Sequence, residues 1–348
     1  VKEFVLHNFS KKERSKFISL FIHFYDQIIL VLKPNIRPDQ PLSFFENWTA
    51  KIELDINKDN YKSALVSLQE ISNAIQNAGY VEEYIRISNL LFINIDWKYA
   101  ISEELNYFNS QFSFFIGTLA DFGKFAEATA FVTKYQKIIT GKGLNYIRLC
   151  RVKSYLFWTQ KYYDEAIKSA REGIELQSKI ENKVPDLSLE TNLALALRDT
   201  LISNKIDEAL HIFLNGRTID ELFDPNNFDF ISGEVFGNVG RFFQFKNDIK
   251  KAIKCYVFSL KRLENEMNKG YGNQWIADCL FIANDFKLCL LFYKNASNIW
   301  KKQSPIKSSY VDKKIKQIIE LYPEYNEIIL PTELEIKNKC EKELSTLS

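Results

Sequence analysis

Glycine and proline are scarce in this chain, which has 12 and 8 of them in 348 residues. Folds made only of β-strands place these two residues at their many turns. Their scarcity therefore favours long helices. Hydrophobic residues make up 46% of the chain and charged residues 26%, so the chain can bury a core and does not have a disordered composition.

A charge excess of either sign is also missing, because the formal net charge is only +2. A protein that binds nucleic acid or an anionic membrane usually shows a clear excess of Lys and Arg. We therefore do not expect nucleic acid as the partner. An RNA-binding array of helical repeats stays as a less favoured alternative.

Residues that hold metals or perform catalysis are few. The three histidines, His7, His23 and His211, have no second His or Cys at ligand spacing, so we expect no metal and no cofactor. No GxSxG or HExxH motif and no complete phosphate-binding loop occurs. The carboxylate pairs at 82–83 and 103–104 are typical of solvated helix faces. We therefore expect that the chain is not an enzyme.

The five cysteines lack the CxxC spacing of metal or redox sites. Their odd number favours buried, reduced thiols over a disulfide framework. This predicts a cytoplasmic location, with removal of an N-terminal signal as the alternative. The five are Cys150, Cys255, Cys279, Cys289 and Cys340.

The N-terminal region should form one helix, because Ser10 and Glu13 have the spacing of a capping box and helical periodicity continues to about Lys33. Its apolar part, Phe17–Leu32, contains Asp26, whereas a membrane span needs about 20 residues with few or no charges. We therefore predict a buried helix and no membrane span. Residues 34–41 hold three prolines and form a linker. This divides the chain into an N-terminal helix with its linker (1–41), a repeat region (42–302) and C-terminal capping helices (303–348).

From Leu42 onward, apolar residues recur at helical spacing, and short polar turns interrupt them every 15–20 residues. One pattern recurs: an aromatic residue or Ile, two further residues, then a small residue. We expect the small residue to lie where the second helix of a hairpin crosses the first, so the pattern predicts a helix–turn–helix array. The pairs are Tyr61/Ala64, Phe125/Ala128, Tyr163/Ala166, Ile206/Ala209, Ile249/Ala252 and Phe286/Cys289.

Two segments, 157–176 and 235–260, resemble the tetratricopeptide repeat (TPR). In the second segment Gly240 and Ala252 occupy the family's two small positions, and Phe243 and Tyr256 occupy aromatic ones. The resemblance covers about residues 111–302 and implies an all-α fold, a right-handed α-solenoid of about six to seven irregular repeats. The family hosts many binding roles, so the resemblance implies protein or peptide binding without naming a partner.

The chain departs from the family in two ways. From Ala128 onward its small residues are 37–43 positions apart, whereas the family repeats at about 34 residues, and the family's helix-ending proline is missing. The segment Ile52–Trp97 is also similar to the start of uncharacterised repeat proteins common in Bacteroidetes. That similarity implies no activity.

The TPR resemblance implies which side chains face a concave groove, namely positions 2, 5, 9 and 12 of each first helix. Twenty such positions hold four Arg and no Lys, although the chain has 36 Lys and 10 Arg. The rigid fork of Arg suits a carboxylate or phosphate. The candidate ligand-groove residues are Arg148, Arg151, Tyr155, Trp158, Arg198, Asn238, Arg241 and Gln244.

Two interpretations of these arginines stay open. They bind a protein or peptide with acidic residues or a C-terminal carboxylate, or they pair with Glu234, Asp278 or other acids and tie the repeats together. We expect a non-catalytic binding scaffold. The alternative is a ligand-sensing domain of a larger protein, similar to peptide-receptor proteins. A basic stretch from Lys301 to Lys316 is expected to be a solvated capping face.

Overall fold

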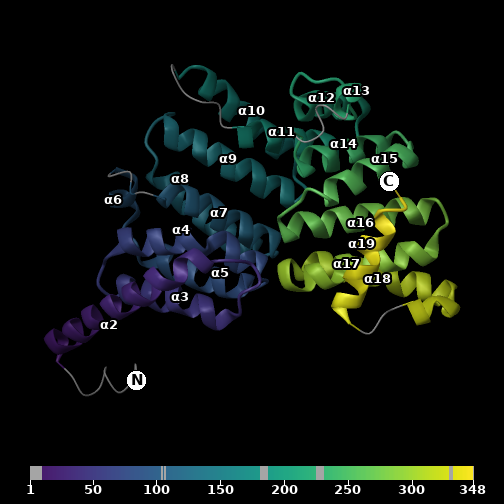
Figure 1. The fold of residues 1–348 in the computed structure, drawn as a ribbon. Coiled ribbons are helices and arrows are strands. Elements are labelled where there is room, and N and C mark those ends of the chain that lie inside the picture. Colours follow the sequence, from purple (N-terminus) through teal and green to yellow (C-terminus); the bar gives the residue numbers. More distant parts are fainter. Residues whose placement is uncertain are drawn as a thin grey trace. The chain divides into compact units, whose positions relative to one another are not determined.

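A computed structural model describes residues 10–102, 105, 107–180, 187–224, 231–328 and 332–347, and every regular element among them is a helix (Figure 1). The predicted all-α class is therefore confirmed. His7 and the carboxylate pair at 103–104 lie outside the described residues.

Contacts divide the chain into two compact units, Val1–Leu119 with Thr133–Ile138, and Ala120–Val132 with Ile139–Ser348. The sequence analysis instead divided the chain at 41 and 302 by the expected limits of the repeat region. That three-part division stays a prediction. The first unit contains α2 (Lys11–Leu32), η1 (Lys33–Asn35), α3 (Leu42–Ile56), α4 (Tyr61–Asn77), α5 (Val81–Asn94), α6 (Trp97–Ser102) and most of α7 (Phe108–Asp121). Helix α8 (Phe125–Ile138) contributes to both units.

The second unit continues with a run of further helices (Figure 1). They are α9 (Leu144–Thr159), α10 (Tyr163–Ser178), α11 (Leu187–Asp199), α12 (Ser203–Leu214), α13 (Ile219–Leu222), α14 (Gly233–Phe245), α15 (Ile249–Leu260), α16 (Glu266–Ile282), α17 (Phe286–Gln303), α18 (Pro305–Leu321), η3 (Pro323–Ile328) and α19 (Glu333–Leu344).

The recurring sequence pattern marks helix starts. Five second helices, α4, α8, α10, α15 and α17, begin at the aromatic or Ile residue of the pattern, and α12 begins three residues before it. All six small residues of the pattern are buried. The first helix of one hairpin also has a small residue at the crossing: on α14, a Cβ atom added to Gly240 would lie 2.5 Å from the ring of Tyr256 on α15.

The turns inside the hairpins share one backbone conformation. Two residues before each of these six helices, one residue has a positive φ. A left-handed residue after a helix lets the last amides turn back onto its free carbonyls. Gly, Asn and Asp adopt this conformation at least cost, whereas Lys161 and Leu201 adopt it without such an advantage. The six residues are Asp59, Gly123, Lys161, Leu201, Asn247 and Asn284.

Helix α2 begins at the predicted capping box, where the Ser10 hydroxyl accepts from the Glu13 amide. The prediction that α2 is buried is wrong: among its described side chains only Ile29 is buried. The helix contacts α3 on one side, which leaves Leu30 and Val31 about 70% exposed. By length and composition, Lys12–Asn35 is the one described helix that could cross a membrane. The absence of a membrane span stays a prediction.

The core of the first unit is aromatic. The rings of Phe92 and Phe115 stack at 5.3 Å, and Trp97 meets Phe112 edge-on at the same distance. Trp97 donates its indole N–H to the Phe92 carbonyl at 2.8 Å. Edge-on and offset ring pairs add about 0.5–1.5 kcal/mol each beyond the area they bury, so this cluster stabilises the hairpins around it.

In the second unit neighbouring helices pack against each other from α9 to α12 and from α14 to α18, and α12 packs on α14. First helices of successive hairpins also meet, α9 with α11 and α14 with α16. This stacking gives one continuous core from Leu214 to Leu344. The five cysteines are buried free thiols, as predicted. Burial raises the pKa of Cys150 to about 11 and those of Cys255 and Cys279 to about 12, which keeps these thiols protonated and unreactive at neutral pH.

Candidate binding surface

First helices of four successive hairpins in the second unit bring six of the eight predicted groove residues into one connected set of contacts. The helices are α9, α11, α14 and α16, and Tyr256 joins from α15. We call this set the α9–α16 cluster. It comprises Tyr155, Trp158, Arg198, Asp199, Asn238, Arg241, Gln244, Tyr256 and Trp275.

Arg198 is held by an internal carboxylate. Its Nε donates to Asp199 Oδ1 at 2.7 Å, and a terminal nitrogen donates to Oδ2 at 2.9 Å. Trp158 donates its indole N–H to the same Oδ2 at 2.9 Å, and Asn238 accepts from the other terminal nitrogen of Arg198. Burial raises the pKa of Asp199, but the charge and hydrogen bonds of Arg198, the hydrogen bond from Trp158 and the charge of Arg241 together lower it more, so the net pKa lies below the usual value. This arginine is 4% exposed and its donors are occupied.

Arg241 lies at the equivalent position one repeat later, 43 residues after Arg198, but its contacts differ. One terminal nitrogen donates to Gln244 Oε1 at 2.7 Å, and that oxygen also accepts from Tyr256 Oη at 2.7 Å. Its guanidinium lies 4.5 Å from the Phe245 ring centre and 5.4 Å from that of Trp275. The Nε atom is buried and has no hydrogen-bond partner.

Trp275 joins the arginines of two repeats, because both Arg198 and Arg241 lie within 6 Å of its ring centre. Cation–ring contacts of this kind contribute about 0.5–2 kcal/mol, depending on how far they are desolvated. Trp275 also meets Tyr256 at 5.5 Å. Trp275 is not among the eight residues that the sequence analysis placed in the groove.

Asp278 was considered as a partner for the arginines, but the hydrogen bonds described for it come from uncharged groups. Tyr293 Oη donates to it at 2.6 Å, and Gln274 donates at 3.4 Å. Burial raises the pKa of Asp278 above its usual value, and Arg241 lowers it only in part. Glu234, the other named candidate, accepts from Asn268 instead.

One predicted groove residue also reaches the start of the second unit. Tyr155 donates its hydroxyl to Asp121 Oδ2 at 2.7 Å, and Lys307 donates to the other carboxylate oxygen at 3.2 Å. The Lys307 ammonium lies 5.0 Å from the ring centre of Tyr271. The prediction that the basic stretch is a solvated face is therefore wrong for Lys307, which is held between an acid and an aromatic ring.

Two predicted groove residues are not joined to the α9–α16 cluster by any described contact. Arg148 donates to Asn145 Oδ1, one turn earlier on α9, at 2.8 Å. Arg151 accepts at its carbonyl from Asn192 on α11 at 3.1 Å, so its backbone helps to join two hairpins. The sequence reasoning missed Asp199 and Trp275. The available signal for Asp199 was its place directly after Arg198 in the sequence.

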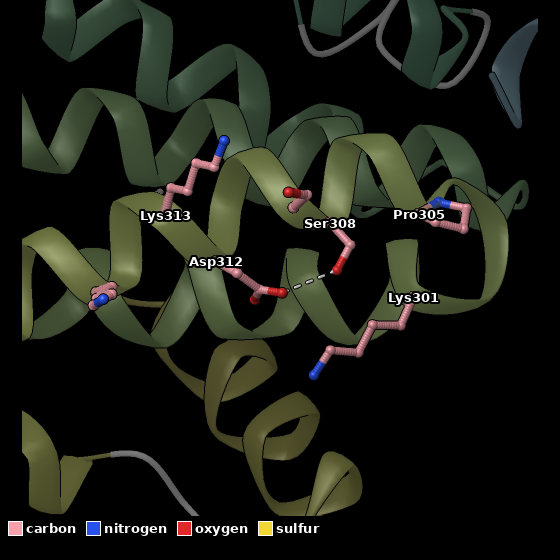
Figure 2. Close-up of a pocket in the computed structure, with 7 residues that line it drawn as sticks. Lys301, Pro305, Ser308, Asp312 and Lys313 are labelled. Carbon is pink, nitrogen blue, oxygen red and sulfur yellow. Dashed lines mark hydrogen bonds between the residues drawn. The ribbon is translucent and has the colours of Figure 1, made fainter.

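A hollow of about 450 Å³ lies on α17 and α18, outside the predicted groove (Figure 2). Asp312 accepts from Ser308 there, at 3.3 Å, and from Ser297 at 2.6 Å. The lysines at its edge are exposed, so screening by salt makes them weak anchors for an anion. Its lining consists of Lys301, Pro305, Ser308, Ser309, Asp312, Lys313 and Lys316.

The first unit contains a polar cluster that the sequence analysis did not anticipate. Lys51 is 5% exposed and donates to Asp55 at 2.8 Å and to Ser63 Oγ at 2.7 Å. The Ser63 hydroxyl donates to the same Asp55 oxygen at 2.7 Å. The charges of Lys51 and Asp55 compensate each other, and Ser63 on α4 hydrogen-bonds to both, so the cluster joins α3 to α4. The Lys–Asp spacing of four residues within an apolar helix was the available signal.

Among the described residues, no three His, Cys, Asp or Glu side chains gather where they could hold a metal ion. In comparisons with known proteins, the chain matches no family model and no curated protein. The geometry of the α9–α16 cluster therefore carries the functional argument by itself.

Proposed function

We propose that the chain is a non-catalytic scaffold that binds a protein or peptide segment on the α9–α16 cluster. In this proposal the helical hairpins form a right-handed α-solenoid of TPR-like repeats, and the cluster lies in its concave groove. The buried small residues at equivalent positions of six second helices and the contacts between successive first helices support this arrangement.

The composition of the cluster is the observation that carries the proposal. Successive first helices contribute Arg, Trp, Tyr and amide side chains to one continuous set, and most of these side chains are only half-buried. Arg and aromatic residues are enriched at protein interfaces, because they offer large flat area and several donors at low entropic cost. The surface therefore fits an extended segment that bears carboxylates, either acidic side chains or a free C-terminus.

This function needs no metal, cofactor or catalytic group, and its partner is neither nucleic acid nor a membrane. It is compatible with the cytoplasmic location that the cysteine pattern predicts. The reduced state of five buried thiols supports that location.

The test is a peptide array probed with the full 348-residue chain. Each peptide is synthesised once with a free C-terminal carboxylate and once as the amide, and acidic sequences are paired with their Gln or Asn counterparts. We expect a subset of carboxylate-bearing peptides to bind, and Trp275→Leu to weaken them. Arg86→Gln serves as the control, because Arg86 lies in the first unit and pairs with Glu53 and Glu83. Binding that no cluster variant alters, or no binding at all, contradicts the proposal.

A further inference from the structure

Arg198 and Arg241 occupy equivalent positions in successive repeats, but the residue that directly follows each arginine is of a different type. The residue after Arg198 is Asp199, whose carboxylate fills the edge of the guanidinium formed by Nε and a terminal nitrogen. The residue after Arg241 is Phe242, which has no such group. The first repeat thus supplies a carboxylate that directly contacts its arginine. In the second repeat, Asp199 and Asp278 interact with Arg241 only through their charge.

The donors of Arg241 show the consequence. Among the described residues, no carboxylate lies within ion-pair distance of Arg241, and its only bonded acceptor is the side-chain oxygen of Gln244. Its buried Nε has no partner at all. An unmet buried donor costs free energy, and such donors are rare in folded proteins unless a ligand or water meets them. Two rings flank the guanidinium and lower the local dielectric, which strengthens any ion pair formed there.

We propose that Arg241 is the residue of the α9–α16 cluster that receives a carboxylate of the bound peptide. The carboxylate takes the same two-pronged contact to Nε and a terminal nitrogen that Asp199 makes with Arg198. This inference rests on the proposed function and adds to it the recognised group and the recognising residue. Because Nε has no contact with solvent, half-buried Phe245 or Trp275 moves aside when the ligand enters.

The probe is the tripeptide acetyl-Glu-Glu-Glu with a neutral fluorophore joined to its C-terminus through an amide, and the same conjugate of acetyl-Gln-Gln-Gln is its neutral counterpart. Fluorescence anisotropy with the full chain should show tighter binding of the Glu peptide, weakening as salt rises. Arg241→Gln should lower its affinity at least tenfold. Arg241→Lys should restore little, because an ammonium cannot make the two-pronged contact. Arg86→Gln should leave the affinity unchanged.

A second pair of variants keeps Arg241 and changes the residue after it. Phe242→Asp should supply an internal carboxylate, as Asp199 does for Arg198, and should lower the affinity for the Glu peptide at least tenfold. Phe242→Asn loses the same ring without adding a charge, so it should keep the wild-type affinity. Circular dichroism on both variants confirms that the helices are retained.

The outcomes separate this inference from the proposed function. If array peptides bind but the Glu peptide does not bind at the same concentrations, the carboxylate assignment is overturned and the scaffold function stands. Equal affinity of wild type and Arg241→Gln for the Glu peptide also overturns it, as does equal loss in Phe242→Asp and Phe242→Asn. If the array yields no binder and the Glu peptide fails as well, both claims are contradicted.

Discussion

Lys307 and Asp121 are 186 residues apart in sequence, and their side chains pair at 3.2 Å within the second unit. Asp121 ends α7, and Lys307 lies in the first turn of α18. The Ser304 hydroxyl donates to the Asp121 carbonyl beside this pair. These contacts join the start of the second unit to α18 near its end. They therefore form only when the hairpins between these two segments are folded.

Breaking this ion pair should destabilise the second unit. Asp121→Asn leaves the Lys307 ammonium about one-fifth exposed without its counter-charge, which should cost about 2 kcal/mol of unfolding free energy. Urea denaturation of the purified chain measures the change. Lys302→Gln is the matched control, because its partner Glu333 and Lys302 itself are both more than half exposed, and such pairs contribute about 0–1 kcal/mol. Equal effects of the two substitutions would contradict the structural role of Asp121.

The contributions of Asp199 and Asp278 to the unfolding free energy should change with pH in opposite directions. The folded-state pKa of Asp199 is lowered, so its contribution to stability is present above the unfolded pKa of about 3.9 and is lost as pH falls through the folded pKa. Asp199→Asn should therefore destabilise the chain by about 3 kcal/mol at pH 7 and by less as the pH falls.

For Asp278 the folded-state pKa is raised by burial, so the folded chain holds its proton more tightly than the unfolded chain does. Stability then falls as pH rises from the unfolded pKa through the folded one. The difference in unfolding free energy between Asp278→Asn and wild type should shift in favour of the variant between pH 4 and pH 7. Thermal unfolding at several pH values measures both variants, and slopes of the same sign would contradict the assigned environments.

Helices α14 and α15 lie so close together at Gly240 that any side chain there should destabilise the fold. In Gly240→Ala the new methyl would lie 2.5 Å from the Tyr256 ring and 3.1 Å from Cys255 Cβ, both buried. Relief of this overlap should cost about 1–3 kcal/mol. Gly143→Ala is the control, because nothing lies within 4 Å of its added methyl and its φ is negative. A Gly240→Ala variant as stable as the control would show that the helices do not pack this closely.

Replacement of Leu201 should stabilise the folded chain. Leu201 adopts a φ of 59° between α11 and α12 and is 64% exposed, so it combines backbone strain with an exposed apolar side chain. Asn tolerates this conformation better, and Leu201→Asn should raise the unfolding free energy by about 0.5–1 kcal/mol. Leu334→Asn, at an equally exposed position inside α19, should instead be neutral or slightly destabilising. Calorimetric melting temperatures distinguish the two.

The sequence predicted the local structure well, because local structure depends on near neighbours. The small residues at Ala166 and Ala252 located second helices, and Ser10 with Glu13 located the start of α2. These features depend only on the spacing of residues within one helix and its preceding turn, and a sequence pattern records that spacing. Six residues of the α9–α16 cluster were named from the TPR resemblance, which implies the positions of each first helix that face the groove.

The misses share a physical cause. The exposure of α2 and the burial of Lys307 both depend on which distant segment lies beside them, and no local pattern contains that information. The choice of Asp199 as the partner of Arg198 depends on side-chain rotamers after the helices have packed. The special role of Arg241 follows from comparing the two repeats, which needs the contacts of both.

Hydrogen–deuterium exchange tests the central claim most directly. It is measured on the full chain alone and with a peptide that the array identified as a binder. The account predicts slower amide exchange in α9, α11, α14 and α16, with the largest change around Arg241 and Trp275. It predicts little change in the first-unit helices α3 and α4 or at the hollow on α17 and α18. Slower exchange confined to α2 or to that hollow, with the α9–α16 cluster unchanged, would contradict the claim that this cluster is the binding surface.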